Sequence, residues 1–133
     1  MPAHATARFE IKSWDEKPYN EMEGAPKLTR ASVTQSYSGD IDGEGTVEYL
    51  MVYGEDGSAS FVGTERVVGR LGDRSGSFVF QGSGVFEAGV ARCSWRVVPG
   101  SGTGDLRGLR GQGGYAAVHG ETAVEITLDY SFE

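Results

Sequence analysis

Glu48 and Glu65 are the two residues whose type and position could do chemistry in this sequence. Each lies in a segment where polar and apolar residues alternate, on the same side as large apolar side chains. Burial and mutual repulsion both raise the pKa of a carboxyl, so one of the two would hold a proton near neutral pH. Such a pair could donate a proton to a carbonyl or epoxide oxygen and remove one elsewhere. The alternatives are a structural network, in which an arginine inside the barrel such as Arg30 neutralises both glutamates, or a bulge that turns Glu48 outward.

The turns between segments predict which side chains share a face, because cross-strand partners point to the same side of a sheet. A four-residue turn at 54–57 pairs Leu50 with Phe61, and a two-residue turn at 72–73 pairs Glu65 with Phe80. Turns at 87–88 and 120–121 extend the phasing to the end of the chain. The face that holds both glutamates is expected to be the interior; its other members are Leu50, Val52, Phe61, Val67, Phe78, Phe80, Cys93, Trp95, Val97, Tyr115, Ala117, Val124 and Ile126.

Five of these interior residues are the candidate ligand contacts around the two glutamates: Phe61, Phe80, Cys93, Trp95 and Tyr115. Cys93 could be a nucleophile, but a buried free cysteine is more often a small core residue. With 2 histidines and 1 cysteine, the sequence cannot assemble a zinc site of the usual kind, and no acidic loop has calcium-binding spacing. We expect no metal and no cofactor.

The elements that position these residues are strands. Two-residue alternation between glycine-rich breaks predicts an all-β chain, and we find no sustained helical pattern. The expected strands are 7–12, 28–37, 45–53, 58–70, 76–86, 90–98, 113–119 and 122–132. Residues 14–26 are expected to form a polar loop or short helix over one end, and 99–114 an irregular segment.

Short turns make consecutive strands antiparallel neighbours, and eight such strands leave two unpaired edges unless the sheet closes. The 133 residues correspond to one domain, 1–133. We therefore predict a closed eight-stranded antiparallel up-and-down barrel, wide enough for side chains or one small ligand. The 21 glycines suit its turns and bends.

Charge and composition exclude several functions. The sequence has 12 Lys and Arg against 19 Asp and Glu, a net charge of −7, which disfavours nucleic acid. No apolar run is long enough for a membrane helix, so no membrane partner is expected. The beginning of the chain does not resemble a secretory signal, and one cysteine cannot form an internal disulfide, so a cytoplasmic location is expected.

A second apolar set is expected on the outer face of the third to fifth strands. Its members are Tyr49, Met51, Tyr53, Val62, Val68, Val79 and Val85. A monomer rarely exposes so much apolar surface, so these residues predict a homo-oligomer formed through this face.

The segment Gly102-Thr103-Gly104-Asp105-Leu106-Arg107-Gly108-Leu109-Arg110-Gly111 resembles a signature of allene oxide cyclase and dirigent barrels. More of the chain, Phe9 to Asp129, resembles a small bacterial family of unknown function with this barrel, through Lys27–Ala31, Gly45–Leu50, Ser75–Phe78 and Val97–Gly104. The resemblance implies an eight-stranded barrel with an interior pocket and self-association, but no settled activity. In those cyclases an interior glutamate assists epoxide opening, for which Glu48 and Glu65 are analogues by chemistry only.

These observations favour a barrel that binds a small, partly apolar organic molecule, oriented by the two glutamates. One alternative is a cofactor-independent cyclase or isomerase that uses the paired glutamates. The other is an oligomeric structural or interaction module whose interior is filled by side chains.

Overall fold

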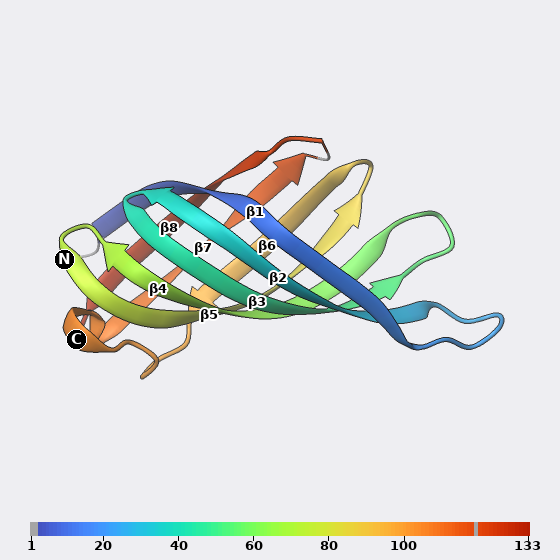
Figure 1. Cartoon of the computed structure of the whole chain (residues 1–133), viewed down its shortest axis with the longest axis horizontal. Coiled ribbons are helices and arrows are strands. Elements are labelled where there is room, and N and C mark those ends of the chain that lie inside the picture. Colours follow the sequence, from blue (N-terminus) through green and yellow to red (C-terminus); the bar gives the residue numbers. More distant parts are fainter. Residues whose placement is uncertain (1–2, 119) are drawn as a thin grey trace.

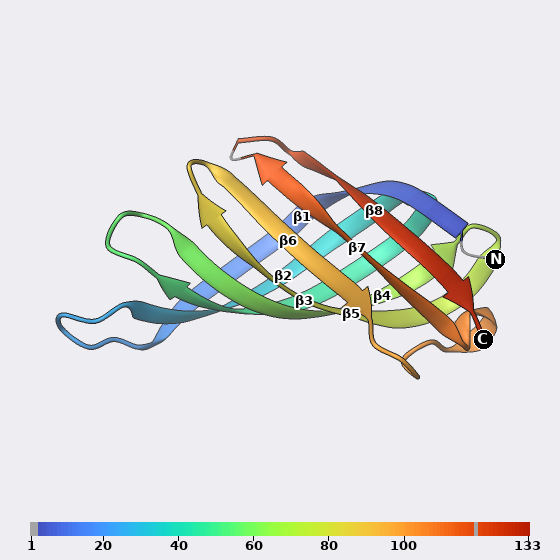
Figure 2. The ribbon, with the colours of Figure 1, turned by 180° about the vertical axis from the view of Figure 1, so that it is seen from behind.

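The computed structural model describes residues 3–118 and 120–133. These residues form eight antiparallel strands and one 3-10 helix. The elements are β1 (Ala3–Asn20), β2 (Lys27–Gly39), β3 (Ile41–Tyr53), β4 (Ala59–Leu71), β5 (Arg74–Glu87), β6 (Val90–Val97), η1 (Gly104–Leu106), β7 (Leu109–Val118) and β8 (Ala123–Phe132). Consecutive strands pair, and β8 returns to pair with β1 (Figures 1 and 2). The prediction of a closed up-and-down barrel is confirmed.

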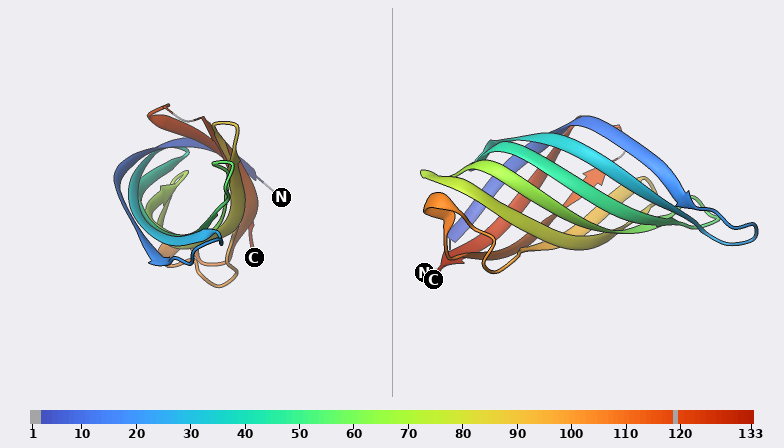
Figure 3. Two further views of the ribbon diagram at one scale, coloured as in Figure 1. Left: turned by 90° about the vertical axis from the view of Figure 1, so that its right-hand side faces the viewer. Right: turned by 60° about the horizontal axis from the view of Figure 1, so that its bottom comes forward.

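The first hairpin is longer than predicted. Residues 14–20 continue β1 and pair with β2 as far as Asn20 opposite Leu28, although a loop or helix was expected there. β1 pairs with β8 only up to Glu10, so beyond that point its outer edge is free among the described strands, and Pro18, which lacks an N–H group, is tolerated there. The end of the β1–β2 hairpin, residues 14–28, projects beyond the rest of the barrel, and we call it the arm (Figure 3).

One end of the barrel is closed by packed side chains. The β2–β3 and β4–β5 turns and the 99–108 segment lie there, with both ends of the described chain (Figure 1). The segment is bonded to β5: Thr103 N donates to Ser77 O at 2.9 Å, and Val79 N donates to Ser101 Oγ at 3.1 Å. It places Leu106 in the core, where it is fully buried. We call this the closed end and the opposite end, with the other four hairpins, the open end.

The predicted interior face is confirmed for β4 to β8. Its aromatic centre is a stack of Phe80 on Trp95, with ring centroids 4.0 Å apart, and Phe78 meets Phe80 edge-on at 5.0 Å. The β5–β6 turn lies at Ala88-Gly89 rather than 87–88, so Trp95 is opposite Gly82 instead of Phe80. Because this changes the register by two residues, the faces stay as predicted.

The predicted face of β3 is wrong. The β3–β4 turn has one more residue than expected, since Tyr53 pairs with Ala59 rather than Ser58, and Gly54 N donates to Ser58 O at 2.8 Å. A shift of one residue turns the whole strand over. Tyr49 and Met51, predicted outside, are therefore buried inside, and Glu48, Leu50 and Val52, predicted inside, face outward.

The outer surface of β3–β5 still carries exposed apolar side chains, in a different combination from the predicted one. We call this set the outer apolar face; it consists of Leu50, Val52, Val62, Val68 and Val85.

Candidate functional site

A cavity of about 360 Å³ opens at the open end of the barrel. This volume is within the range of small-molecule sites. All eight strands contribute to its wall, and aromatic rings form much of it: Phe9, Trp14, Tyr49, Tyr53, Phe61, Phe86 and Tyr115. Small and aliphatic side chains, including Met51, Ala59, Ala91 and Ala117, complete the wall.

Gln35 contacts this cavity, and behind it lies the one interior carboxyl among the described residues, Glu65. Glu65 is 3% exposed. Gln35 Nε2 donates to its Oε2 at 2.7 Å, and the Tyr37 hydroxyl lies 2.9 Å from both carboxyl oxygens and donates to them. Gly45 leaves the room, because a Cβ there would lie 2.1 Å from Oε2.

No described lysine, arginine or histidine forms an ion pair with Glu65. Burial raises the pKa of Glu65 to about 7, and the hydrogen bonds from Gln35 and Tyr37 oppose this rise. Glu65 thus lies inside as predicted, and burial raises its pKa without the predicted repulsion from Glu48. The carboxyl changes charge near neutral pH inside the barrel.

Two tyrosines meet across the interior between Gln35 and the open end. The hydroxyls of Tyr49 from β3 and Tyr115 from β7 are 3.1 Å apart. Burial raises the pKa of both phenols, so they are neutral at physiological pH. They offer a polar point inside an otherwise apolar wall.

The predicted ligand contacts divide into two groups. Phe61 and Tyr115 line the open cavity. Phe80, Cys93 and Trp95 instead surround a space of only about 10 Å³ beside Glu65, which is too small for an organic molecule. Burial raises the pKa of Cys93 to about 11, so its thiol stays protonated and is a poor nucleophile. Trp95 Nε1 is buried without a hydrogen-bond partner among the described residues.

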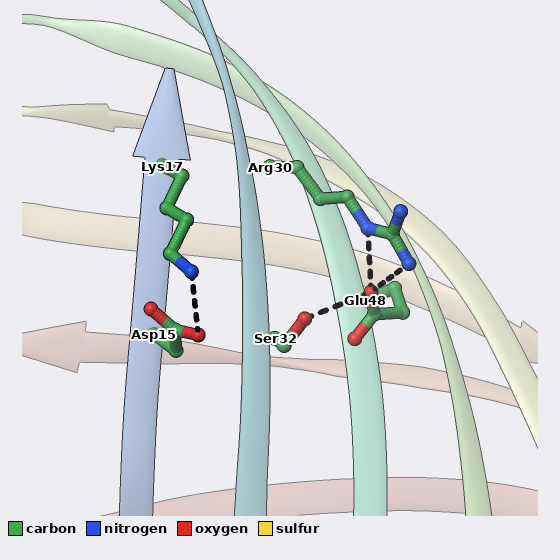
Figure 4. Close-up of polar contacts among 5 residues, drawn as sticks. All are labelled: Asp15, Lys17, Arg30, Ser32 and Glu48. Carbon is green, nitrogen blue, oxygen red and sulfur yellow. Dashed lines mark hydrogen bonds and ion pairs between the residues drawn. The ribbon is translucent and has the colours of Figure 1, made fainter. Parts of the chain in front are cut away.

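Glu48 is not part of the interior site. It lies on the outer face, where Arg30 donates to its Oε1 from both Nε and Nη2 at 2.7 Å, and Ser32 Oγ donates at 2.9 Å (Figure 4). These hydrogen bonds, that of Ser32 first, lower the pKa of Glu48. Its predicted interior position is wrong, and so is the alternative in which an arginine inside the barrel neutralises both glutamates, because Arg30 pairs with Glu48 on the outer face. The same close-up shows Lys17 and Asp15, 3.8 Å apart, on β1.

The sequence interpretation missed a cluster at the cavity rim around Glu16. Trp14 Nε1 donates to Oε1 at 2.9 Å, Thr29 Oγ1 donates to Oε2 at 2.7 Å, and the Tyr53 hydroxyl also donates to Oε2. Burial raises the pKa of Glu16, but these three hydrogen bonds and the charge of Lys27 outweigh it and lower the pKa overall. The Trp14 ring stacks on Tyr49 at 6.0 Å. The run Trp14-Asp15-Glu16-Lys17 has no alternation of polar and apolar residues, so the sequence held no local signal for this strand.

Among residues 3–118 and 120–133, no group of three or more His, Cys, Asp or Glu side chains is arranged to hold a metal ion. The same residues contain no helix with the length and apolar character needed to span a membrane.

Fold and site together define a small β-barrel with a packed closed end and an aromatic pocket at the open end. Residues 5–130 match a family described as "Protein of unknown function (DUF3224)", and the chain belongs to this family. The crystal structure of a DUF3224 protein of unknown function from Shewanella oneidensis MR-1 is similar, with 28% identity and a TM-score of 0.80 over 100% of this chain and 99% of that one. A search of curated proteins gave no match. The resemblance to a bacterial family of unknown function is thereby confirmed, and the one to cyclase and dirigent barrels stays a resemblance.

Proposed function

We propose that the protein binds a small, partly apolar organic molecule in the cavity at the open end. The observation that carries the proposal is the cavity itself: about 360 Å³ of space lined by seven aromatic side chains, with polar groups at only a few points. Packed barrels fill their interior with side chains, as this one does at the closed end. An aromatic-lined space with few polar groups is typical of a binding site.

The polar groups around the cavity are better suited to orienting a bound ligand than to catalysing a reaction of it. Gln35 already donates to Glu65, while the Tyr49 and Tyr115 hydroxyls contact each other and could turn toward a ligand. A cyclase or isomerase with paired glutamates is not supported, because Glu48 is outside the barrel. Glu65 alone could hold a proton, but Gln35 and Tyr37 occupy its oxygens. Binding is therefore the function that the site supports best.

Two neighbouring alanines on β7 provide the test. Ala117 lines the cavity, whereas Ala116 is exposed on the outer side of the same strand. We expect Ala117→Phe to fill the cavity and Ala116→Phe to leave it open, with the same chemical change in each.

The probe is the neutral fluorophore N-phenyl-1-naphthylamine, added to each purified protein. Wild type and Ala116→Phe should give a saturable rise in fluorescence, and Ala117→Phe should lose it. Circular dichroism verifies that both variants are folded. No saturable signal in wild type, or an equal signal in folded Ala117→Phe, would contradict the proposal.

A further inference from the structure

The walls and the mouth of the cavity have a consistent electrostatic character. Glu121 is the one charged side chain among the described residues of the wall, and no described lysine or arginine contacts the cavity. A carboxylate or phosphate ligand would enter this space without a cationic partner, and an unpaired buried charge is costly. The lining therefore disfavours anions.

The turns around the mouth of the cavity also carry negative charge. The four open-end turns comprise residues 21–26, 54–58 and 88–89, and the described residues 120–122 of the last turn. Their described residues include five carboxylates and no lysine or arginine; the carboxylates are Glu21, Glu23, Glu55, Asp56 and Glu121. Charge of one sign around a cleft raises the local concentration of oppositely charged ligands.

Two lysines, Lys17 and Lys27, lie near the turn of the arm. Lys17 faces Asp15 at 3.8 Å, and Lys27 Nζ lies 5.2 Å from the centroid of the Tyr53 ring. The second contact is informative, because an aromatic ring of the rim already holds an ammonium group over its face. Aromatic rings attract cations through the negative charge of their faces.

We infer that the natural ligand is an organic cation, such as an aryl or alkyl ammonium compound. Its apolar part would lie against Phe61, Phe86 and Tyr115 inside the cavity. Its cationic group would lie toward the mouth, near the Trp14 ring and the Glu16 carboxylate, within the field of the acidic turns. This inference rests on the proposed function and specifies the chemical class of ligand for the same site.

Three compounds of matched shape separate charge from apolar fit. Phenyltrimethylammonium, tert-butylbenzene and benzenesulfonate each carry a tetrahedral group on one phenyl ring, with charges of +1, 0 and −1. Each is titrated against N-phenyl-1-naphthylamine bound to wild-type protein, at low and at high salt. We expect the cation to compete best, by about tenfold over the anion at low salt, and the advantage to shrink as salt screens the acidic turns.

A charge variant locates the effect. Glu121→Gln removes the carboxylate at the rim, and Asp73→Asn in the β4–β5 turn removes one at the closed end as the matched control. Glu121→Gln should lower the affinity for phenyltrimethylammonium by about two- to threefold and leave the affinity for tert-butylbenzene unchanged. Asp73→Asn should change neither affinity.

The outcomes distinguish this inference from the function on which it rests. If the fluorophore binds but tert-butylbenzene or benzenesulfonate competes as well as the cation, the cation preference is wrong and the pocket stands. If the fluorophore binds and none of the three compounds displaces it, the cation preference is equally refuted. If the fluorophore itself does not bind in the cavity, both proposals fail.

Discussion

Replacing Glu65 by glutamine should change the pH dependence of stability in a direction that follows from its burial. The carboxyl is 3% exposed and has no cationic partner among the described residues, and its pKa rises from 4.5 to about 7 in the folded protein. The folded state therefore binds a proton more tightly than the unfolded state. The contribution to stability is fully present below the unfolded pKa and is lost as the pH rises through the folded value.

The size of the effect follows from the two pKa values. A difference of about 2.5 pH units corresponds to about 3 kcal/mol, most of which is lost between about pH 4.5 and pH 7.5. Glutamine has nearly the same shape and cannot ionise. The free energy of unfolding of wild type should thus fall by about 3 kcal/mol relative to Glu65→Gln across this range.

The assay is urea unfolding followed by tryptophan fluorescence at a series of pH values, for wild type and Glu65→Gln in parallel. Subtracting the two curves cancels all other titrating groups. Glu48→Gln is the control, because its ion-paired carboxyl has a lowered pKa and is partly exposed. Its difference curve should be shallow and of opposite sign, with stability lost as the pH falls. A flat Glu65 curve, or one that rises with pH, would refute the reasoning about the buried carboxyl.

Three further predictions follow from single contacts. Gly45→Ala should lower the free energy of unfolding by more than about 2 kcal/mol in urea titrations, because the new Cβ would collide with the Glu65 carboxyl; an unchanged midpoint would show that the interior can give way. Tyr53→Phe should cost about 1–2 kcal/mol by the same measurement, since Glu16 loses a donor, and no loss would mean that this hydrogen bond contributes nothing. The outer apolar face predicts self-association with a second copy, so sedimentation should give at least a dimer for wild type and a smaller mass for Val62→Lys; a wild-type monomer at micromolar concentration would contradict this.

The strand count, the closure and the interior face of five strands could be predicted from the sequence, because alternation and turn residues are local signals. The face of β3 could not. It depends on whether the turn after Tyr53 has four or five residues, and the side chain of Asp56, which binds Ser58 N and Oγ, decides this in favour of five. One residue in one turn therefore moved Glu48 out of the site and Tyr49 into it.

The arm was hidden for a different reason. Residues 14–20 are exposed on both faces for most of their length, so burial produces no clear alternation, and Pro18 is typical of a loop. Its pairing with β2 lies beyond the point at which β1 separates from β8. The rim cluster of Trp14, Glu16 and Tyr53 joins strands far apart in sequence and became visible only in three dimensions.

Native mass spectrometry of the freshly purified protein tests the central claim most directly, because it weighs whatever occupies the open-end cavity. We predict that wild type and Ala116→Phe carry the same additional small mass, released on denaturation, and that Ala117→Phe carries none. Wild-type protein at the mass of the bare chain, or the same adduct on folded Ala117→Phe, would contradict a ligand in this cavity.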